Sequence, residues 1–178
     1  MVDISNGNGV NRLELKKGDF IIDFGQVFQI IDTKTITNPT GTDTLLIFSP
    51  FFKPDQESEI TSSIPLKNID KTTIRPPISR KQVQEVLDVL SDKKIKKDII
   101  VVDVLTAKAV LNQNNPYEIA QTVRKIYLEK ICKDMKFTGS KNYIFELLIS
   151  RLAEEIALVL DISPDKATTK IHNQLKKK

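Results

Sequence analysis

The sequence predicts an α+β protein of two small domains, an antiparallel β domain followed by an all-α helical domain of about five helices. Two observations carry this prediction. Most Phe, Pro and Thr residues precede residue 79, in segments typical of strands and turns. After it, apolar residues recur at helical spacing behind residues that cap helices. We therefore expect, within the 178 residues, a disordered tail over 1–14, a β domain over 15–77 and a helical domain over 78–178.

The β domain should contain four strands, because four of its segments are rich in aromatic and β-branched residues. The expected strands are Asp19–Phe24, Val27–Ile36, Leu45–Phe48 and Ile60–Leu66. Gly25-Gln26 and Asn38-Pro39-Thr40-Gly41 separate the first three as turns. We expect this small antiparallel sheet to curl into a barrel. Arg75-Pro76-Pro77 ends the domain, because proline disfavours helical geometry in the residue before it.

The helical domain should begin each of four helices at a recognisable cap. The expected caps are Ser79, Asn115, Thr138 and Ser163. Asn115 gives the clearest signal, because Pro116 suits the first helical position and Glu118 the capping-box position. The segment Asp98–Leu111 favours a strand at its start and a helix at its end, and we interpret it as the remaining helix.

The composition argues against an enzyme. With one Cys (Cys132) and one His (His172), an internal disulfide is impossible and a zinc site of several Cys and His ligands is excluded. No Gly-rich phosphate loop follows a strand. We expect no catalytic residue, no cofactor, no metal and no small-molecule substrate. No apolar run approaches the ~20 residues that cross a bilayer, so we expect a cytoplasmic protein without membrane contact.

Charge is unevenly distributed along the chain. Residues 1–78 contain 8 basic and 10 acidic residues, a net charge of −2, whereas residues 79–178 contain 19 and 13, a net charge of +6. The excess in the second half fits either solvated helix faces or a surface that meets a polyanion. The densest basic segment contains Lys93, Lys94, Lys96 and Lys97. It could be a solvated loop between helices, or it could neutralise several DNA phosphates.

Five short motifs occur in order along the chain: Lys17-Gly18-Asp19, Ile64-Pro65, Arg75-Pro76-Pro77-Ile78-Ser79, Pro116–Arg124 and Leu152–Leu158. Together they resemble the CarD/CdnL-like bacterial transcription regulators, whose first domain also occurs in the transcription-repair coupling factor. The resemblance extends from about Leu15 to Leu175, and it depends on the order and spacing of the motifs.

The resemblance implies a Tudor-like or SH3-like barrel that binds the β-subunit lobe of RNA polymerase. It also implies a helical domain that contacts promoter double-stranded DNA near the transcription bubble and modulates the stability of the open complex. A protein of this kind is cytoplasmic and nucleoid-associated. By position, the polymerase-binding residues are Thr33, Lys34, Thr35 and Ile36, with Ser63 beside Pro65.

One departure from the family concerns the DNA contact. Well-known members insert a Trp from the second helix into the minor groove, but this chain has no Trp. Counting back from Pro116 without gaps places Ile100 at that position. An aliphatic side chain can act as a wedge in the minor groove, or the run Ile99–Val102 can belong to the core. Ile100 and the four lysines are therefore the candidate DNA-binding residues, and a polymerase-binding adaptor without the DNA wedge is the alternative.

Overall fold

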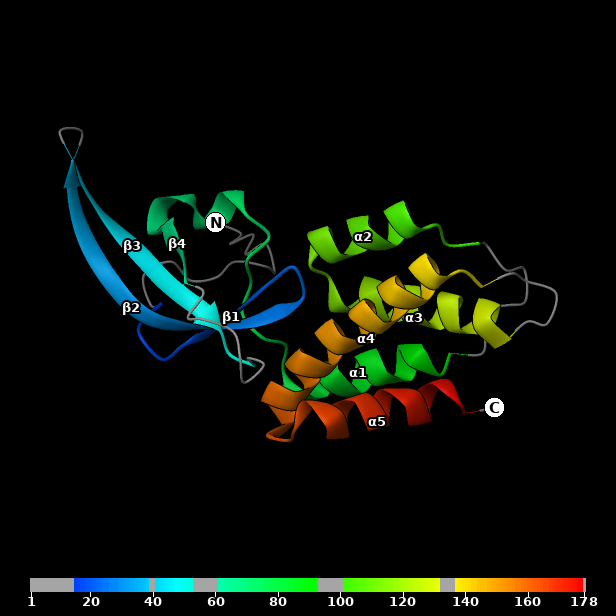
Figure 1. Cartoon of the computed structure of the whole chain (residues 1–178). Coiled ribbons are helices and arrows are strands. Elements are labelled where there is room, and N and C mark those ends of the chain that lie inside the picture. Colours follow the sequence, from blue (N-terminus) through cyan, green and yellow to red (C-terminus); the bar gives the residue numbers. More distant parts are fainter. Residues whose placement is uncertain (1–14, 39–40, 53–60, 93–100, 132–136, 178) are drawn as a thin grey trace, which may run out of the picture. The chain divides into compact units, whose positions relative to one another are not determined.

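The computed structural model describes residues 15–38, 41–52, 61–92, 101–131 and 137–177. Within these ranges, four β-strands come first and five α-helices follow, with one short 3-10 helix between the two groups (Figure 1). The chain divides into two compact units between Pro77 and Ile78. The predicted α+β class, with strands before helices, is confirmed.

The first unit contains one antiparallel sheet in which neighbours in sequence are neighbours in space. Its strands are β1 (Phe20–Asp23), β2 (Gln26–Asn38), β3 (Gly41–Pro50) and β4 (Ser62–Pro65), in the order β1-β2-β3-β4. The described strands form an open sheet with β1 and β4 at its edges. The expected strand Leu45–Phe48 was too short, because pairing with β2 continues to Gly41. The expected strand Ile60–Leu66 was too long at its end, since Leu66 already belongs to the 3-10 helix.

The turn between β1 and β2 lies one residue earlier than Gly25-Gln26. Asp23 pairs with Gln26, which leaves Phe24 and Gly25 as the two-residue loop. Both have positive φ, 49° for Phe24 and 72° for Gly25. This is the pattern of a type I′ turn, whose twist matches that of the flanking strands.

A hydrophobic core cluster of the first unit lies on one face of the sheet. Its buried side chains are Ile21, Ile30, Leu46, Phe48, Ile69 and Ile74. Ile69 belongs to the 3-10 helix η1 (Leu66–Lys71), which the sequence analysis missed. Phe28 packs edge-on against Phe48, with 5.4 Å between the ring centroids. η1 therefore covers the apolar face of the sheet.

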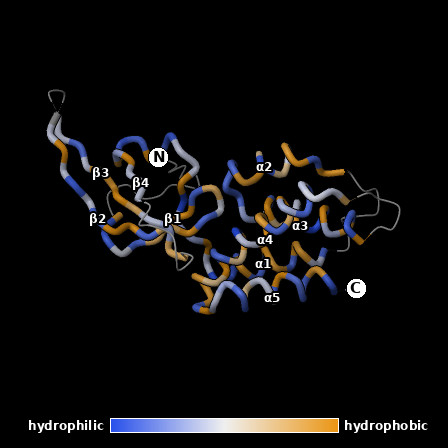
Figure 2. The backbone as a smooth tube through the Cα atoms, viewed as in Figure 1, coloured by the Kyte–Doolittle hydropathy of each residue, from blue (hydrophilic) through white to orange (hydrophobic). Residues whose placement is uncertain are grey.

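The second unit is a bundle of helices with side-chain caps. The helices are α1 (Arg80–Leu90), α2 (Val104–Gln113), α3 (Pro116–Ile131), α4 (Gly139–Leu160) and α5 (Pro164–Leu175). Ser79, Thr138 and Ser163 each accept a hydrogen bond from the backbone N–H three residues later, as predicted. The Asn115 side chain accepts the Tyr117 N–H at 3.0 Å at the start of α3. Hydrophobic and hydrophilic residues alternate along these helices, as expected when one face is buried (Figure 2).

α2 was predicted as a helix over Asp98–Leu111, and its boundaries were wrong. The helix begins only after Asp103, whose side chain accepts the Thr106 N–H at 2.8 Å. It ends at Gln113, and the C-cap Asn114 adopts the left-handed conformation with φ 58°. The cap and the left-handed residue are local signals that outweigh the apolar periodicity. Among the described residues, no helix is both long and apolar enough to cross a membrane.

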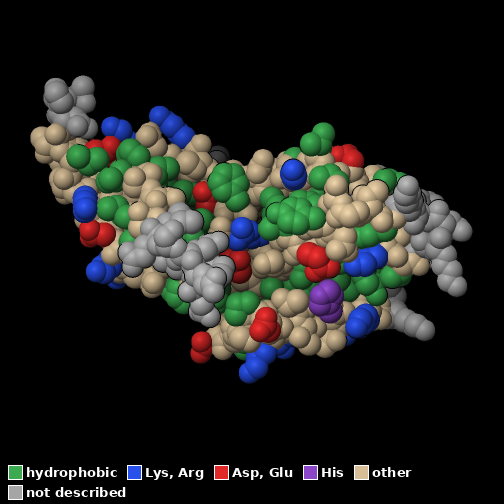
Figure 3. Space-filling model, in the orientation of Figure 1, with side chains coloured by type: hydrophobic (Ala, Val, Ile, Leu, Met, Phe, Trp, Pro, Cys, Tyr) green, Lys and Arg blue, Asp and Glu red, His purple; other side chains and the backbone are tan. Residues whose placement is uncertain are grey.

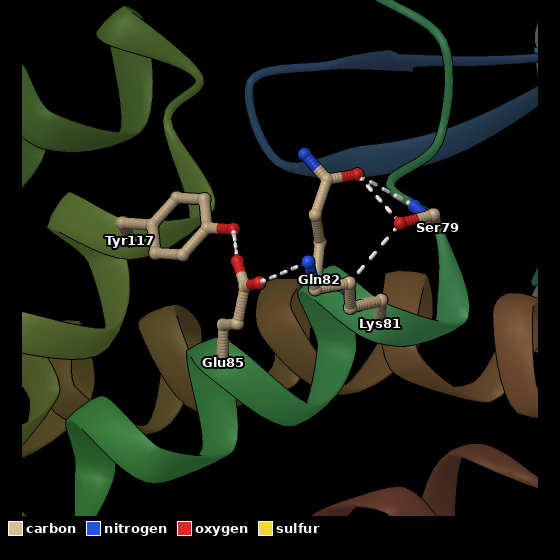
Figure 4. A network of polar contacts seen from close by, with 5 residues as sticks. All are labelled: Ser79, Lys81, Gln82, Glu85 and Tyr117. Carbon is tan, nitrogen blue, oxygen red and sulfur yellow. Dashed lines mark hydrogen bonds and ion pairs between the residues drawn. The ribbon is translucent and has the colours of Figure 1, made fainter.

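A polar network joins the start of α1 to the start of α3 (Figure 4). Ser79 and Gln82 form a capping box, in which the Ser79 N–H donates to the Gln82 side chain at 2.9 Å. The Tyr117 hydroxyl donates to Glu85 at 2.6 Å, and the Lys81 ammonium lies 4.0 Å from the same carboxylate. The hydrogen bond to Glu85 raises the pKa of Tyr117 above its usual value. The network fixes α1 against the first turn of α3.

Candidate functional site

The outer part of β2 presents an open strand edge. β1 pairs with β2 only from Gln26 to Gln29, and the backbone of Gly18 and Asp19 extends this pairing to Ile30. From residue 31 onward, no described strand pairs with this edge, while β3 pairs with the other edge as far as Asn38. β2 and β3 continue beyond the rest of the sheet as a two-stranded ribbon (Figure 1). The predicted residues Thr33–Ile36 lie in this open segment.

A bulge in β2 decides which face of the sheet these side chains occupy. The pairing shifts between Ile30, opposite Phe48, and Asp32, opposite Ile47. Directly paired residues share a face and successive residues alternate. Lys34 and Ile36 therefore lie on the same face as their β3 partners Leu45 and Asp43, and Thr33 and Thr35 lie on the opposite face.

Ser63 does not join the open β2 edge. It lies on β4 and pairs with Ile47 of β3, so β3 separates it from β2. Two strand spacings, about 10 Å, lie between the backbones of β2 and β4. The register does place Ser63 on the same face as Lys34 and Ile36, because Ile47 pairs with both Asp32 and Ser63. The structure thus gathers Thr33–Ile36 at one edge and leaves Ser63 at the other.

On the face of the sheet that carries Lys34 and Ile36, one charge is neutralised by an ion pair and another is not. The Lys67 ammonium lies 2.9 Å from the Asp43 carboxylate, and this hydrogen-bonded ion pair lowers the pKa of Asp43. Lys34 is exposed and forms no ion pair with any residue that the structure describes. An exposed ammonium beside an open strand edge can pair with a carboxylate on an incoming chain.

The predicted DNA-binding residues Lys93, Lys94, Lys96, Lys97 and Ile100 lie outside the described residues. Of the two residues that follow Ile100, the first has an exposed side chain and the second a buried one. Val101 is 58% exposed, whereas Val102 is 7% exposed and belongs to the core. The apolar run Ile99–Val102 therefore contributes to the core at its described end.

Glu129 holds this segment against the bundle. Its Oε1 accepts the Val102 N–H at 2.6 Å, and its Oε2 pairs with the Lys141 ammonium. Both side chains are buried, with 2% and 11% exposed. Asp103 then caps α2, and its hydrogen bonds from Thr106 lower the pKa of the carboxyl group. Glu129 could not be recognised from the sequence, because its partners are 27 and 12 residues away in the chain.

Two helical residues in the motifs behind the family resemblance serve packing. The Arg124 guanidinium is buried and donates to the Leu175 carbonyl at 2.7 Å, at the end of α5. Glu155 is buried and accepts the Ile78 N–H at 3.0 Å, just before α1. A cation at a helix C-terminus satisfies a carbonyl without an intrahelical partner. These two residues thus fix helix ends.

His172 is half-buried on α5, and Cys132 lies outside the described residues. No group of three or more His, Cys, Asp or Glu side chains that could hold a metal occurs among the residues placed by the structure.

The exposed lysines in and just after α5 were not among the predicted DNA-binding residues. Lys166, Lys170, Lys176 and Lys177 are all exposed. A count of charges over short windows distinguishes this segment from the rest of the second half, because residues 166–178 contain five Lys and no Asp or Glu.

A scan against protein-family models matches no family, and a search of curated proteins finds no significant match.

Proposed function

We propose that this chain is a CarD-like, non-enzymatic transcription regulator, which binds the β-subunit lobe of bacterial RNA polymerase with its first unit and promoter DNA with its helical unit. In this proposal the chain modulates the stability of the open complex, and the open sheet is the framework of a Tudor-like or SH3-like barrel. The observation that carries it is the open edge of β2 from residue 31 to Asn38, at the position where the resemblance places the polymerase contact.

An open strand edge offers a row of backbone N–H and C=O groups to another chain. An extended strand of the polymerase lobe would add to the sheet beside Thr33–Ile36, where hydrogen bonds between the backbones supply affinity and set the register. Natural proteins usually cover or shorten such edges, because they promote aggregation. The 13-residue length of β2 therefore supports a role in binding.

Side chains beside this edge would provide specificity. Lys34 supplies an exposed positive charge, and Ile36 supplies a half-buried apolar side chain on the same face. Across β3, Ser63 would contact the partner only through side chains, because its backbone lies two strands away. We therefore expect Lys34 and Ile36 to contribute more to polymerase binding than Ser63.

The polymerase contact is tested by measuring the binding of the full chain to the isolated β-subunit lobe. The Lys34→Glu/Ile36→Ala variant should bind at least about tenfold more weakly, since it reverses a charge and removes apolar area at the edge. Lys71→Glu is the matched control, because Lys71 is exposed in the same unit but lies in η1. Absence of wild-type binding at micromolar concentration would refute the polymerase contact.

The alternative function is a polymerase-binding adaptor without DNA contact. It is favoured by the absence of Trp from the chain and by Asp103, whose carboxylate is used as a helix cap where the family has basic residues. The lifetime of polymerase–promoter open complexes separates the two functions. A lifetime that changes when the chain is added supports the regulator, and an unchanged lifetime despite polymerase binding supports the adaptor.

A further inference from the structure

The segment from Lys166 to the last residue, which covers most of α5 and the lysines that follow it, carries the chain's excess of positive charge. Residues 166–178 contain five Lys and no acidic residue, whereas residues 1–165 contain 22 basic and 23 acidic residues, a net charge of −1. The net charge of +4 for the whole chain therefore depends on this terminal segment. In Figure 3, Lys and Arg side chains lie near both ends of α5.

The lysines of α5 gather on one face. Successive helical residues are about 100° apart, so Lys166 and Lys170 differ by about 40° around the axis. Lys177 lies just beyond the C-cap Lys176, whose backbone keeps right-handed helical angles. At about 1.5 Å per residue, this α5 lysine face (Lys166, Lys170 and Lys177) is about 16 Å long.

Packing on the other side orients this face outward. Ala167, Ile171 and Leu175 are at most 1% exposed, which holds their side of α5 against the bundle. The three lysines are exposed and form no ion pair with any residue in the described ranges. Their charges are therefore available to an external anion.

We propose that the α5 lysine face binds the phosphate backbone of double-stranded DNA. This inference rests on the proposed function and names the element that would make a promoter contact. A duplex carries one charge per about 1.7 Å of its axis, both strands counted, so about 16 Å of duplex carries about ten phosphates, of which those on the near side can meet this face. Lysine contacts of this kind position a protein on DNA without reading the base sequence.

Two features favour duplex DNA over other polyanions. An amphipathic helix that inserts into an anionic membrane presents an apolar face to it, but the apolar side of α5 is buried in the bundle. A single-stranded nucleic acid would be expected to stack on aromatic side chains, and residues 164–178 contain no Phe, Tyr or Trp. Binding to anionic vesicles without binding to duplex DNA would overturn the inference.

The test compares full-length variants for binding to duplex DNA over a range of salt concentrations. Lys166→Gln/Lys170→Gln/Lys177→Gln should bind about tenfold more weakly or worse, and its plot of log K against log salt should be shallower by about 2–3. Lys16→Gln/Lys17→Gln/Lys71→Gln is the matched control, because it removes the same charge from exposed lysines of the first unit. The control should keep the wild-type slope. Circular dichroism checks that α5 stays helical, which Gln favours about as well as Lys.

The outcomes separate this inference from the proposed function. Wild-type protein that does not bind duplex DNA even at low salt would refute both the α5 inference and the DNA contact of the proposed function. Wild-type protein that binds DNA, together with an α5 variant indistinguishable from the control, would refute the α5 inference alone. Equal losses in both variants would likewise refute it, because they would reflect net charge rather than this face.

Discussion

At the scale of single residues, Glu129 is a buried carboxylate that joins three segments of the helical unit. It joins α3 to Lys141 at the start of α4 and to the Val102 backbone before α2. A buried charge is tolerated only when it is paired and hydrogen-bonded. One carboxylate therefore determines how three segments meet.

Removing the Glu129 charge should strongly destabilise the protein. Glu129→Gln leaves the Lys141 ammonium buried without a counter-charge, and we expect the free energy of unfolding to fall by about 3–5 kcal/mol. Glu129→Gln/Lys141→Met should recover most of this loss, because the amide oxygen still accepts the Val102 N–H and no charge remains buried. Urea unfolding measures both values. A double variant as unstable as the single variant would contradict this account.

Asp23 and Asp43 should respond to pH in opposite directions. Burial raises the pKa of Asp23 above 3.8, against the hydrogen bonds from Thr73 and from Phe24. The hydrogen-bonded ion pair with Lys67 lowers the pKa of Asp43 below 3.8. Stability from Asp23 is thus present below about pH 3.8 and lost as pH rises through its folded pKa. Stability from Asp43 is present above about pH 3.8 and lost as pH falls through its folded pKa.

These signs predict the behaviour of two matched variants. At neutral pH, Asp23→Asn should be more stable than the wild type, and Asp43→Asn should be less stable. Both differences should shrink on acidification, because the wild-type carboxyl groups become neutral. Urea unfolding at several pH values measures the differences. Two variants that shift stability in the same direction at neutral pH would show that charge is not the cause.

At the scale of elements, the β1–β2 hairpin and the β2 edge show how local backbone geometry shapes the sheet. Phe24 adopts a positive φ that suits Asn, Asp or Gly, and its side chain is 54% exposed. Phe24 therefore has a strained backbone conformation, and its exposed side chain gains little stabilisation from burial to offset that strain. The bulge after Ile30 similarly determines which side chains accompany the open edge of β2.

Phe24→Asn should stabilise the first unit. Asn tolerates the left-handed conformation, and relief of the strain should raise the free energy of unfolding by about 1 kcal/mol. Chemical denaturation followed by far-ultraviolet circular dichroism measures the change. Phe28→Asn is the contrasting variant, because Phe28 packs against Phe48 and its replacement should destabilise the unit. Loss of stability in Phe24→Asn would mean that the exposed ring stabilises the fold by more than the backbone strain at Phe24 destabilises it.

At the scale of the whole molecule, each unit has its own core. The cluster of the first unit draws only on residues 15–74, and the helices of the second unit pack on one another around α4. A chain segment with its own core can fold alone. The two halves also differ in net charge, −2 for residues 1–78 and +6 for residues 79–178.

The helical unit produced as residues 78–178 should therefore fold without the first unit. We expect a helical circular dichroism spectrum and a single cooperative denaturation transition, because α1, α3, α4 and α5 bury one another's apolar faces. Phe145→Asp in the same fragment is the control, since it places a charge at a side chain that is 2% exposed and should abolish the transition. A wild-type fragment that unfolds without cooperativity would contradict the independence of this unit.

Features that depend on a few neighbouring residues were predictable from sequence. Ser79, Thr138 and Ser163 cap helices where the local pattern placed them. The start of α2 was misjudged, because the run before Asp103 favours a strand and only the residues after it favour a helix, but the whole segment was interpreted as one helix. The prediction of Thr33–Ile36 as a strand was correct, but its open edge depends on where β1 ends.

The sequence by itself determined the α+β class, the order of strands and helices and most helix caps, because these follow from propensity and from hydrogen bonds within one turn. Only the tertiary structure decided the open edge of β2, the separation of Ser63 from it, and the burial of Glu129, Arg124 and Glu155. Each of these depends on contacts between residues far apart in the chain, which no local pattern encodes. The outward direction of the α5 lysines depends on both the sequence and the tertiary structure. Helical spacing in the sequence aligns the lysines, and the packing of Ile171 and Leu175 turns them toward solvent.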